Sequence, residues 1–214
     1  METIKTFFVS TVYMNQKNNI LKQGFLIIAK DGIRSFTVDR LSSMLRISKK
    51  TIYAFFSTKE ILIDKIIKSK LYEIDKVMND ILVKNDCPIK CFHEINRFHI
   101  KMSGDIDISK LIELKVKYPF VWSRIEKHRK NELDVVKKII KNAKLMNYLR
   151  SGLDSNLVSK LYINIIDKTF QPEFFIQQNM TYKETINLFA DIMANGIFND
   201  RGLKLLEKIG EENI

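Results

Sequence analysis

The residues of this sequence best suited to chemistry are a short run of polar and basic side chains, Lys49-Lys50-Thr51 followed by Tyr53. Lysine can donate hydrogen bonds to guanine O6 and N7, and threonine offers a hydroxyl and a methyl group to a base edge. On the exposed face of a short helix, such side chains are typical of a protein that reads DNA in the major groove. The alternative is an ordinary helical hairpin with a solvated basic face, and the pattern favours DNA binding over it.

Two short helices are needed to hold this run against a groove. Thr37 and Ser48 are residue types that favour N-cap positions, so a helix is expected after each, with a break at Arg46-Ile47. Apolar residues recur at the steps that would pack the two helices together: Val38, Leu41, Leu45, Ile47, Ile52 and Phe56. The spacing therefore predicts a helix-turn-helix from Thr37 to Phe56.

Helical patterns flank this unit on both sides. Before it, apolar residues from Asn18 onward form one face of a helix that Gly32 would end. After it, Ser57 and Glu60 have the spacing of a capping box, which predicts a long helix with Ser57 as its N-cap. Residues 1–16 are interpreted either as an N-terminal arm or as an extra helical turn packed on the body.

The rest of the chain has the pattern of amphipathic helices separated by polar breaks, beginning near Pro88, because proline suits the first helical turn. No segment alternates like a β-strand, and the 214 residues include only three prolines and seven glycines. The predicted fold class is all-α: a three-helix N-terminal domain joined by a long helix to a C-terminal helical domain. The helices of that second domain are expected at 89–102, 108–117, 119–146, 155–178 and 182–198.

Other kinds of chemistry find little support. Cys87 and Cys91, with His93 and His99 beyond, invite a metal or redox interpretation, but structural zinc sites usually need a second ligand pair that this sequence lacks. Packed or surface cysteines are the default interpretation, and the role of the two is left open. His128 lies in a charged run that is interpreted as a solvated helix face. No Gly-rich phosphate loop, HExxH or nucleophile-elbow pattern is present, so we expect neither an enzyme nor a bound metal or cofactor.

The chain as a whole is basic, with a formal net charge of +11 and an isoelectric point near 9.5. This balance suits a polyanion, either nucleic acid or an anionic membrane surface, without choosing between them, and it can also reflect an AT-rich genome. No stretch approaches the roughly 20 apolar residues of a membrane span. Two cysteines in a chain of this length fit a reducing compartment, so we expect a cytoplasmic protein.

The residues around the predicted helix-turn-helix resemble the DNA-binding domain of the TetR family. The likeness runs without insertion from Ile20 to Leu62, and its most specific part is the segment from Ser48 onward, SKKTIYAFFSTKEIL. By this resemblance, Lys49, Lys50 and Thr51 would form the base-reading turn. The full set of DNA-binding residues is expected to be Thr37, Ser48, Lys49, Lys50, Thr51, Tyr53, Phe55 and Lys59.

Three members of this set match positions that touch the DNA backbone, namely Thr37, Tyr53 and Lys59. A cation in the first turn of a helix is disfavoured by the helix dipole, so an external phosphate is a sensible partner for Lys59. The alternatives are a solvated surface lysine for Lys59 and a partly buried core tyrosine for Tyr53.

Two residues depart from the family's pattern. Arg46 stands where the family usually has glycine, and a positive φ at that position would cost an arginine about 1 kcal/mol. Gly24 stands where alanine is usual, and close helix packing is the expected reason. Neither departure removes a residue expected to face DNA.

The C-terminal part resembles the same family more thinly, at Tyr118–Ile125, Leu149–Asp154 and Phe189–Ile197. The resemblance implies a regulatory domain that encloses a small-molecule effector and dimerises through the last two long helices. The candidate ligand-binding residues are Phe98, Trp122, Tyr162 and Phe170, and core packing is the alternative role for each of them.

The predicted organisation has three parts: an N-terminal arm at 1–16, a DNA-binding domain at 17–83, and a regulatory and dimerisation domain at 84–214. The resemblance implies a ligand-responsive repressor that binds a pseudo-palindromic, double-stranded DNA operator as a homodimer. The alternative is a helical dimer that acts mainly through protein–protein contacts, with DNA as a tether. No membrane partner is expected.

Overall fold

Helices make up the regular structure of this protein. The computed structural model describes residues 2–212, without the side chains of residues 2–11 and of Leu133. Within this range the one departure from helices and loops is an isolated antiparallel β-bridge between Leu149 and Phe198. The all-α prediction is therefore confirmed. No helix in the described part has both the length and the apolar character needed to cross a lipid bilayer.

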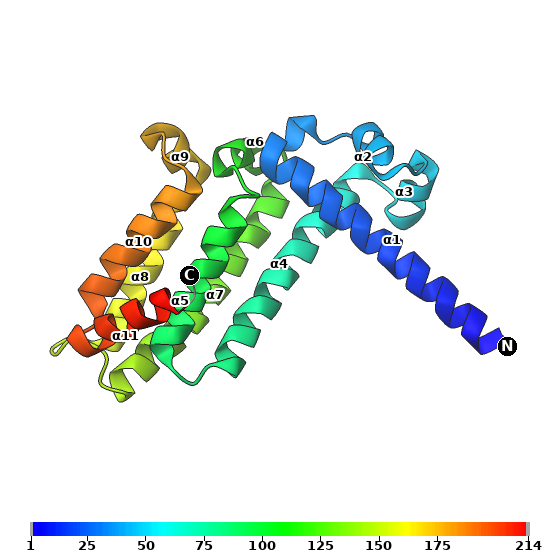
Figure 1. The fold of residues 1–214 in the computed structure, drawn as a ribbon. Coiled ribbons are helices and arrows are strands. Elements are labelled where there is room, and N and C mark those ends of the chain that lie inside the picture. Colours follow the sequence, from blue (N-terminus) through cyan, green and yellow to red (C-terminus); the bar gives the residue numbers. More distant parts are fainter. Residues whose placement is uncertain (1, 213–214) are drawn as a thin grey trace.

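The N-terminal half consists of three helices gathered at one end of a long fourth (Figure 1). A 3₁₀ turn at Ile33–Ser35 follows the first helix, which crosses the fourth and continues past the second and third toward the N-terminus. The helices are α1 (Glu2–Asp31), α2 (Val38–Leu45), α3 (Lys49–Phe55) and α4 (Lys59–Lys84).

Helix α1 begins much earlier than the pattern from Asn18 suggested. It is continuous from Glu2 to Asp31, through the expected boundary between arm and domain. The physical reason is the absence of a breaker: no proline occurs in this stretch, and its first glycine is Gly24. Residues 2–16 therefore extend a helix of the body, and the division at residues 16 and 83 stays a prediction.

The C-terminal half is a bundle of long helices with the short helices α6 and α9 at one end (Figure 1). A 3₁₀ turn at Ile108–Leu111 (η2) precedes α6. The helices are α5 (Pro88–Ser103), α6 (Ile112–Lys117), α7 (Pro119–Leu145), α8 (Ser155–Thr169), α9 (Pro172–Gln178), α10 (Tyr182–Ile197) and α11 (Asp200–Glu211).

Two helices of this half differ from expectation. The single helix predicted over 155–178 is wrong, because Pro172 occupies the first turn of a separate helix and the residue before a proline avoids helical geometry. Helix α11 was not anticipated. The Asn199 side chain caps it by accepting a hydrogen bond from the Gly202 amide at 3.0 Å, and Arg201 lies over the Tyr148 ring at 4.8 Å.

The start of α4 also differs from the predicted capping box. Thr58, not Ser57, is the N-cap, and its hydroxyl oxygen accepts a hydrogen bond from the Ile61 amide at 3.2 Å. Since the cap is one residue later, Glu60 falls at the second position of the helix and has lost the capping-box spacing.

Buried apolar side chains form two cores that divide within α4. One contains Ile63, Ile66 and Ile67 together with α1, α2 and α3, and the other begins at Ile74 and Met78 and fills the C-terminal bundle. The first core also takes in Leu114 of α6 and Val121 of α7. The two halves are therefore joined by packing as well as by the length of α4.

Gly24 is a buried residue of α1 that faces this first core. A Cβ atom built on it would lie 2.4 Å from Ile66 Cδ1 and 3.3 Å from Phe36 Cε2. The first of these distances is too short for any side chain to be tolerated without movement. Close helix packing, expected from the sequence, is thus the reason for this glycine.

Candidate nucleic-acid interface and internal cavity

Side-chain caps fix the start of both helices of the helix-turn-helix. The Thr37 hydroxyl oxygen accepts a hydrogen bond from the Arg40 amide at 3.1 Å, and the Ser48 hydroxyl oxygen accepts one from the Thr51 amide at 3.0 Å. Each cap satisfies a first-turn N–H that has no partner within its own helix. Both predicted helix starts are confirmed.

The turn between the helices is made by Arg46 in a left-handed conformation, with φ 54° and ψ 41°. The amides of Arg46 and Ile47 donate to the carbonyl oxygens of Ser43 and Ser42 at 3.2 and 3.1 Å, which closes the end of α2. The positive φ considered from the sequence is therefore present, with its cost of about 1 kcal/mol for a residue with a Cβ.

The inner faces of α2 and α3 are buried in the first core. Leu41 and Ile52 have no accessible surface, and Val38 and Phe56 are nearly as buried. Leu45 and Ile47, the remaining predicted packing positions, pack against that core as partly buried residues. Because these side chains hold the two helices together, the opposite face of α3 is left outward.

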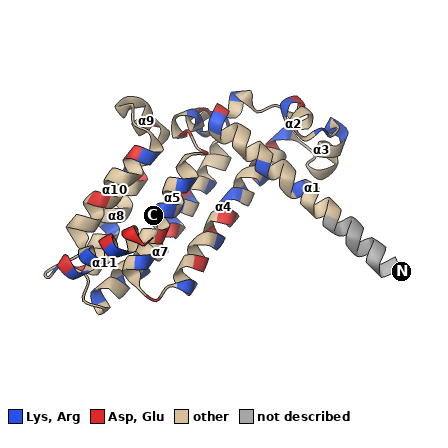
Figure 2. Cartoon of the chain, in the orientation of Figure 1, with Lys and Arg blue, Asp and Glu red and all other residues tan. Residues whose placement is uncertain are grey.

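The outward face of α3 carries the polar and basic residues singled out in the sequence. Ser48, Lys49 and Lys50 are exposed, Tyr53 is 44% exposed and Thr51 is half-buried. The Ser48 and Thr51 hydroxyls lie 2.8 Å apart, so the cap also orients the threonine side chain. Lysine and arginine residues are visible on both α2 and α3 in Figure 2.

The structure distinguishes two lysines that the sequence treats alike. Lys49 forms an ion pair with Asp39 in the first turn of α2, and the hydrogen bond and charge of Asp39 raise the pKa of Lys49. Lys50 makes no ion pair with any side chain that the structure describes. The contact between positions 39 and 49 crosses from one helix to the other, so no short-range spacing in the sequence reveals it.

The three remaining predicted DNA contacts lie at the edges of this face. Thr37 is exposed, and Lys59 is half-buried with its ammonium group 5.9 Å from the centre of the Phe36 ring. Phe55 is also half-buried, and its ring centre lies 4.2 Å from that of Tyr13 on α1. Phe55 thus has a packing role in the structure, whatever it contributes to DNA binding.

A cavity of about 190 Å³ lies among helices of both halves. Its lining includes Phe25 and Ala29 from α1, Ile74 from α4, Tyr162 from α8 and Ile186 from α10. Helix α1 belongs to the first core, and α8 and α10 belong to the second. A change in the packing around this cavity would therefore affect both cores.

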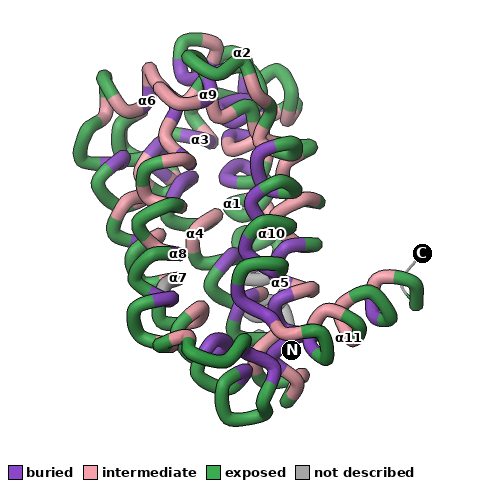
Figure 3. Tube along the Cα trace, turned by 90° about the vertical axis from the view of Figure 1, so that its left-hand side faces the viewer, coloured by how far each residue is buried: buried purple, intermediate pink, exposed green. Residues whose placement is uncertain are grey.

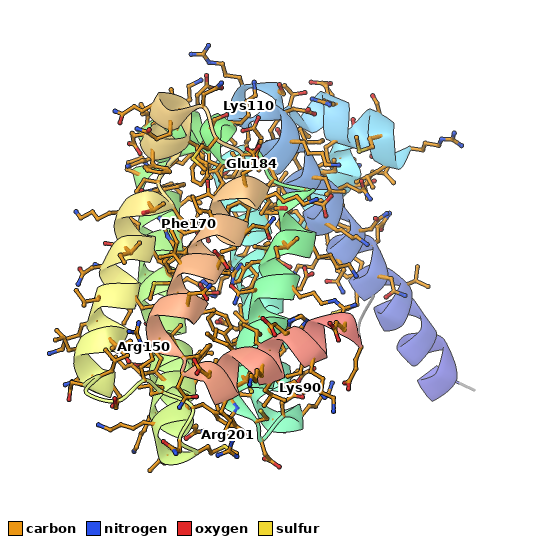
Figure 4. All side chains as sticks on the ribbon, turned by 60° about the vertical axis from the view of Figure 1, so that its left-hand side comes forward. Lys90, Lys110, Arg150, Phe170, Glu184 and Arg201 are labelled. Carbon is orange, nitrogen blue, oxygen red and sulfur yellow. The ribbon has the colours of Figure 1, made fainter. Side chains whose placement is uncertain are left out.

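Three of the four aromatic residues proposed as ligand contacts line this cavity: Trp122, Tyr162 and Phe170. Figure 4 labels Phe170 where the chain leaves α8, and its ring lies edge-on to those of Tyr182 and Phe189. Phe98 is not among the lining residues and packs against the second core instead. On α5 the lining positions include Ile95, His99 and Met102, one helical face that excludes Phe98.

The cavity also has polar lining residues that the sequence did not reveal. His128 was interpreted as part of a solvated face, which is wrong: the residue is 8% exposed and its Nε2 lies 2.9 Å from Asp75 Oδ1 on α4. Arg129, Glu132, His99 and Tyr182 join it in the lining. Their helical spacing could have identified them, because positions 125, 128, 129, 132 and 136 share one face of α7. The charged residues between these positions obscured that spacing.

Burial perturbs the ionisation of these groups. It lowers the pKa of His99 to about 4, with a smaller contribution from His128, and raises the pKa of Glu132 to about 7, with a smaller contribution from Asp75. Burial also raises the pKa of Tyr182, whose hydroxyl lies 3.2 Å from His99 Nδ1.

A stripe of exposed apolar side chains runs along α8 and α10. Each helix contributes residues four positions apart, on one helical face, and each of these side chains is more than two-fifths exposed. Figure 3 shows exposed positions along both helices. The stripe consists of Leu157, Leu161, Ile165, Leu188 and Ile192.

The two cysteines occupy the start of α5. Cys91 is buried, with its sulfur 3.2 Å from the Asn85 carbonyl oxygen, and burial raises the pKa of its thiol. Cys87 is the half-buried N-cap residue of the same helix. Their positions are those of packed residues at a helix start.

Comparisons with known proteins agree with this geometry, although no family model matches the sequence. An uncharacterised HTH-type transcriptional regulator of Bacillus subtilis, YvaF, is 24% identical over 184 residues, which cover 85% of this chain and 95% of that protein. A TetR transcription regulator from Haloarcula marismortui has a TM-score of 0.69 at 16% identity, with 87% of this chain and all of that chain covered.

A second similar structure is the regulator FadR of Bacillus subtilis in complex with stearoyl-CoA. Its TM-score is 0.58 at 20% identity, and the superposition covers 84% of this chain and 98% of that one. The resemblance noted in the sequence is therefore confirmed: the chain has the fold of the TetR-family transcription regulators.

Proposed function

We propose that this chain is a non-enzymatic, cytoplasmic transcription regulator that binds an operator in double-stranded DNA as a homodimer and releases it, as a repressor does, when a small molecule occupies the cavity. The observation that carries the proposal is the helix-turn-helix. Its inner faces are buried, its caps and turn are fixed, and its second helix presents Ser48, Lys50 and Tyr53 outward. The similarity to a regulator named as HTH-type supports it.

The contacts with DNA are assigned from this exposed face. Lys50 and Thr51 suit base edges, because they lie in the first turn of α3, the part of a recognition helix that enters the groove. Ser48, Thr37, Tyr53 and Lys59 suit the phosphate backbone. Lys49 would either leave its ion pair with Asp39 to contact DNA, or keep that ion pair and hold α2 against α3 while Lys50 contacts the base.

The apolar stripe on α8 and α10 suits a second copy of the chain. Five large apolar side chains exposed on two adjacent helices are more than a monomer usually shows at one place. Two stripes packed together would form a symmetric dimer that carries one recognition helix on each side.

The response to a ligand is supported by how the cavity meets the DNA-binding half. Two side chains of α1 line it, and the Asp107 amide, ahead of η2, donates to the Ala29 carbonyl oxygen of α1 at 2.9 Å. Arg34, in the 3₁₀ turn after α1, lies 2.7 Å from Glu113 of α6. A ligand that favoured a different packing here would change the setting of α1 and the recognition helices. The similar FadR structure holds stearoyl-CoA, which supports a small-molecule effector.

DNA binding is tested with the double variant Lys50→Ala and Tyr53→Ala. Both side chains are exposed, so we expect the fold and the dimer to survive while specific binding falls by about 100-fold or more, since two DNA contacts are lost. Gel-shift titration against DNA enriched from a random pool measures this.

The matched control is Lys84→Ala with Tyr72→Ala, which removes the same two residue types from exposed positions on α4. It should bind as the wild type does. Equal DNA affinity of the α3 variant and this control would refute the assignment of α3 as the recognition helix.

A further inference from the structure

Five of the polar side chains that line the cavity come from α5, α7 and α10, and on α7 they lie between apolar residues. On α7, Trp122 and Ile125 precede His128, Arg129 and Glu132 in the lining, and Val135 and Val136 follow them. Helices α5 and α10 add one member each. The polar belt is defined as His99, His128, Arg129, Glu132 and Tyr182.

Most groups of the polar belt have partners within the protein. His99 and Tyr182 are paired with each other, and His128 lies against Asp75, with Glu132 Oε1 3.9 Å from its other ring nitrogen. Tyr182 and His99 are hydrogen-bonded to each other, whereas His128 Nε2 has an ion-pair contact with Asp75 but no hydrogen-bond partner.

Arg129 has the most unsatisfied donors of the polar belt, because two of its nitrogens lack an acceptor whereas His128 lacks a hydrogen-bond partner at Nε2 alone. Its Nη1 donates to the Phe170 carbonyl oxygen at 2.6 Å, and its guanidinium carbon lies 5.5 Å from the centre of the Trp122 ring. Its Nε and Nη2 are buried and have no hydrogen-bond partner. A buried donor without an acceptor is costly, more so when it is charged, so an acceptor supplied to these two nitrogens would stabilise the protein.

The charges around Arg129 favour an acceptor oxygen over another cation. Asp167, Glu126 and Glu132 act on its guanidinium through their charge, but none donates or accepts a hydrogen bond at Nε or Nη2. Because burial raises the pKa of Glu132 to about 7, that carboxyl is only partly ionised at neutral pH. The Arg129 guanidinium therefore has negative charge nearby, but its Nε and Nη2 have no hydrogen-bond acceptor.

We propose that the cavity binds an apolar acyl compound whose chain lies along the apolar lining and whose carbonyl or carboxylate oxygen accepts hydrogen bonds from Nε and Nη2 of Arg129. Apolar lining residues for the chain come from three further helices: Ile74 and Met78 of α4, Ile95 of α5 and Phe25 of α1. This inference rests on the proposed function, in which the cavity holds the effector.

The protein carries its own reporter for this binding. Trp122 is the single tryptophan of the sequence, lies in the cavity lining and contacts Arg129. Its fluorescence is followed in the full-length protein during titration with decanoate, dodecanoate and hexadecanoate, below the concentrations at which they form micelles. We expect saturable changes with an acyl compound and none with dodecylamine, which has a similar chain and a cationic head.

The role of Arg129 is tested with Arg129→Gln, with Lys130→Gln as the control. Both changes remove one positive charge from α7, but Lys130 is exposed and outside the lining. The Kd for dodecanoate should rise about tenfold or more in the first variant, because hydrogen bonds to a charged group are lost, and stay unchanged in the second.

A second variant, Glu132→Gln, is expected to change the affinity for dodecanoate in the opposite direction, and it keeps the proposal testable if Arg129→Gln fails to fold. Glu132→Gln removes a carboxylate that would repel the ligand's own, so it should tighten the binding of dodecanoate above pH 7 and leave that of methyl dodecanoate unchanged. Methyl dodecanoate also separates the two oxygen types: tighter binding of dodecanoate assigns the carboxylate, and tighter binding of the ester assigns the carbonyl.

Equal binding of dodecylamine and dodecanoate, or no effect of either Arg129→Gln or Glu132→Gln on dodecanoate binding, would overturn the acyl assignment. Failure of the proposed function has a different signature, measured on the same samples. Arg129-dependent binding of dodecanoate without DNA release supports the acyl site and contradicts the ligand response, whereas DNA release by compounds without an acyl oxygen contradicts the acyl site alone.

Discussion

His99 and Glu132 show how single buried residues give this molecule an unusual dependence on pH. The folded state keeps His99 neutral to about pH 4, whereas the unfolded chain protonates it near 6.5, so stability from this residue is lost as pH falls through that window. The folded state keeps the proton of Glu132 up to about pH 7, whereas the unfolded chain loses it near 4.5, so this contribution is lost as pH rises. Between pH 4.5 and 6.5 the two slopes oppose each other.

Single variants should separate the two slopes. Relative to wild type, the free energy of unfolding of His99→Gln should fall as pH rises from 4.5 to 6.5, and that of Glu132→Gln should rise, each by up to about 1.4 kcal/mol per pH unit. Urea denaturation at a series of pH values measures both, and other titrating groups cancel in the differences. Parallel curves for all three proteins would show that neither residue titrates as described.

At this scale the sequence predicted what is local and missed what is not. Thr37 and Ser48 were assigned as caps because capping depends on residues three positions apart. The pairs Lys49–Asp39 and His128–Asp75 join separate helices, and their partners follow from the packing. The sequence contains no spacing that identifies them.

Among the elements, the helices bounded by strong local signals were predicted best. Gly32 ends α1 with a positive φ, and Pro88 and Pro119 begin α5 and α7, as their residue types indicate. The break at Pro172 was missed although proline carries the same signal there, because apolar residues continue on both sides of it. Helix α11 was missed because two glycines lie within its twelve residues.

The stripe of apolar side chains on α8 and α10 is predicted to form the dimer interface. Leu161→Glu with Leu188→Glu places two charges at half-exposed apolar positions, so each chain should stay folded while the dimer dissociates, because a buried carboxylate without a partner is unfavourable. Light scattering coupled to gel filtration measures the mass. Leu145→Glu, at a position on α7 that is 75% exposed and outside the stripe, is the control and should remain dimeric. A double variant of dimer mass would place the interface elsewhere.

For the whole molecule, the two cores explain how binding in one half can reach the other. They divide within α4, yet Leu114 and Val121 from the C-terminal half belong to the first core, and the cavity has lining residues from α1 to α10. The sequence predicted two helical domains but not the packing that they share. Contacts between helices far apart in the chain do not produce a periodic pattern in the sequence. The domain limits at 16 and 83 remain predictions for the same reason.

Two copies of α3, each with its Lys50, are proposed to read DNA together, and selection of binding sites from a random double-stranded DNA pool measures this. We expect enrichment of an inverted repeat whose half-sites lie about one helical turn, or a multiple of it, apart, and loss of that enrichment in the Lys50→Ala, Tyr53→Ala variant. An absence of enrichment, or a single half-site bound equally well by that variant, would contradict it.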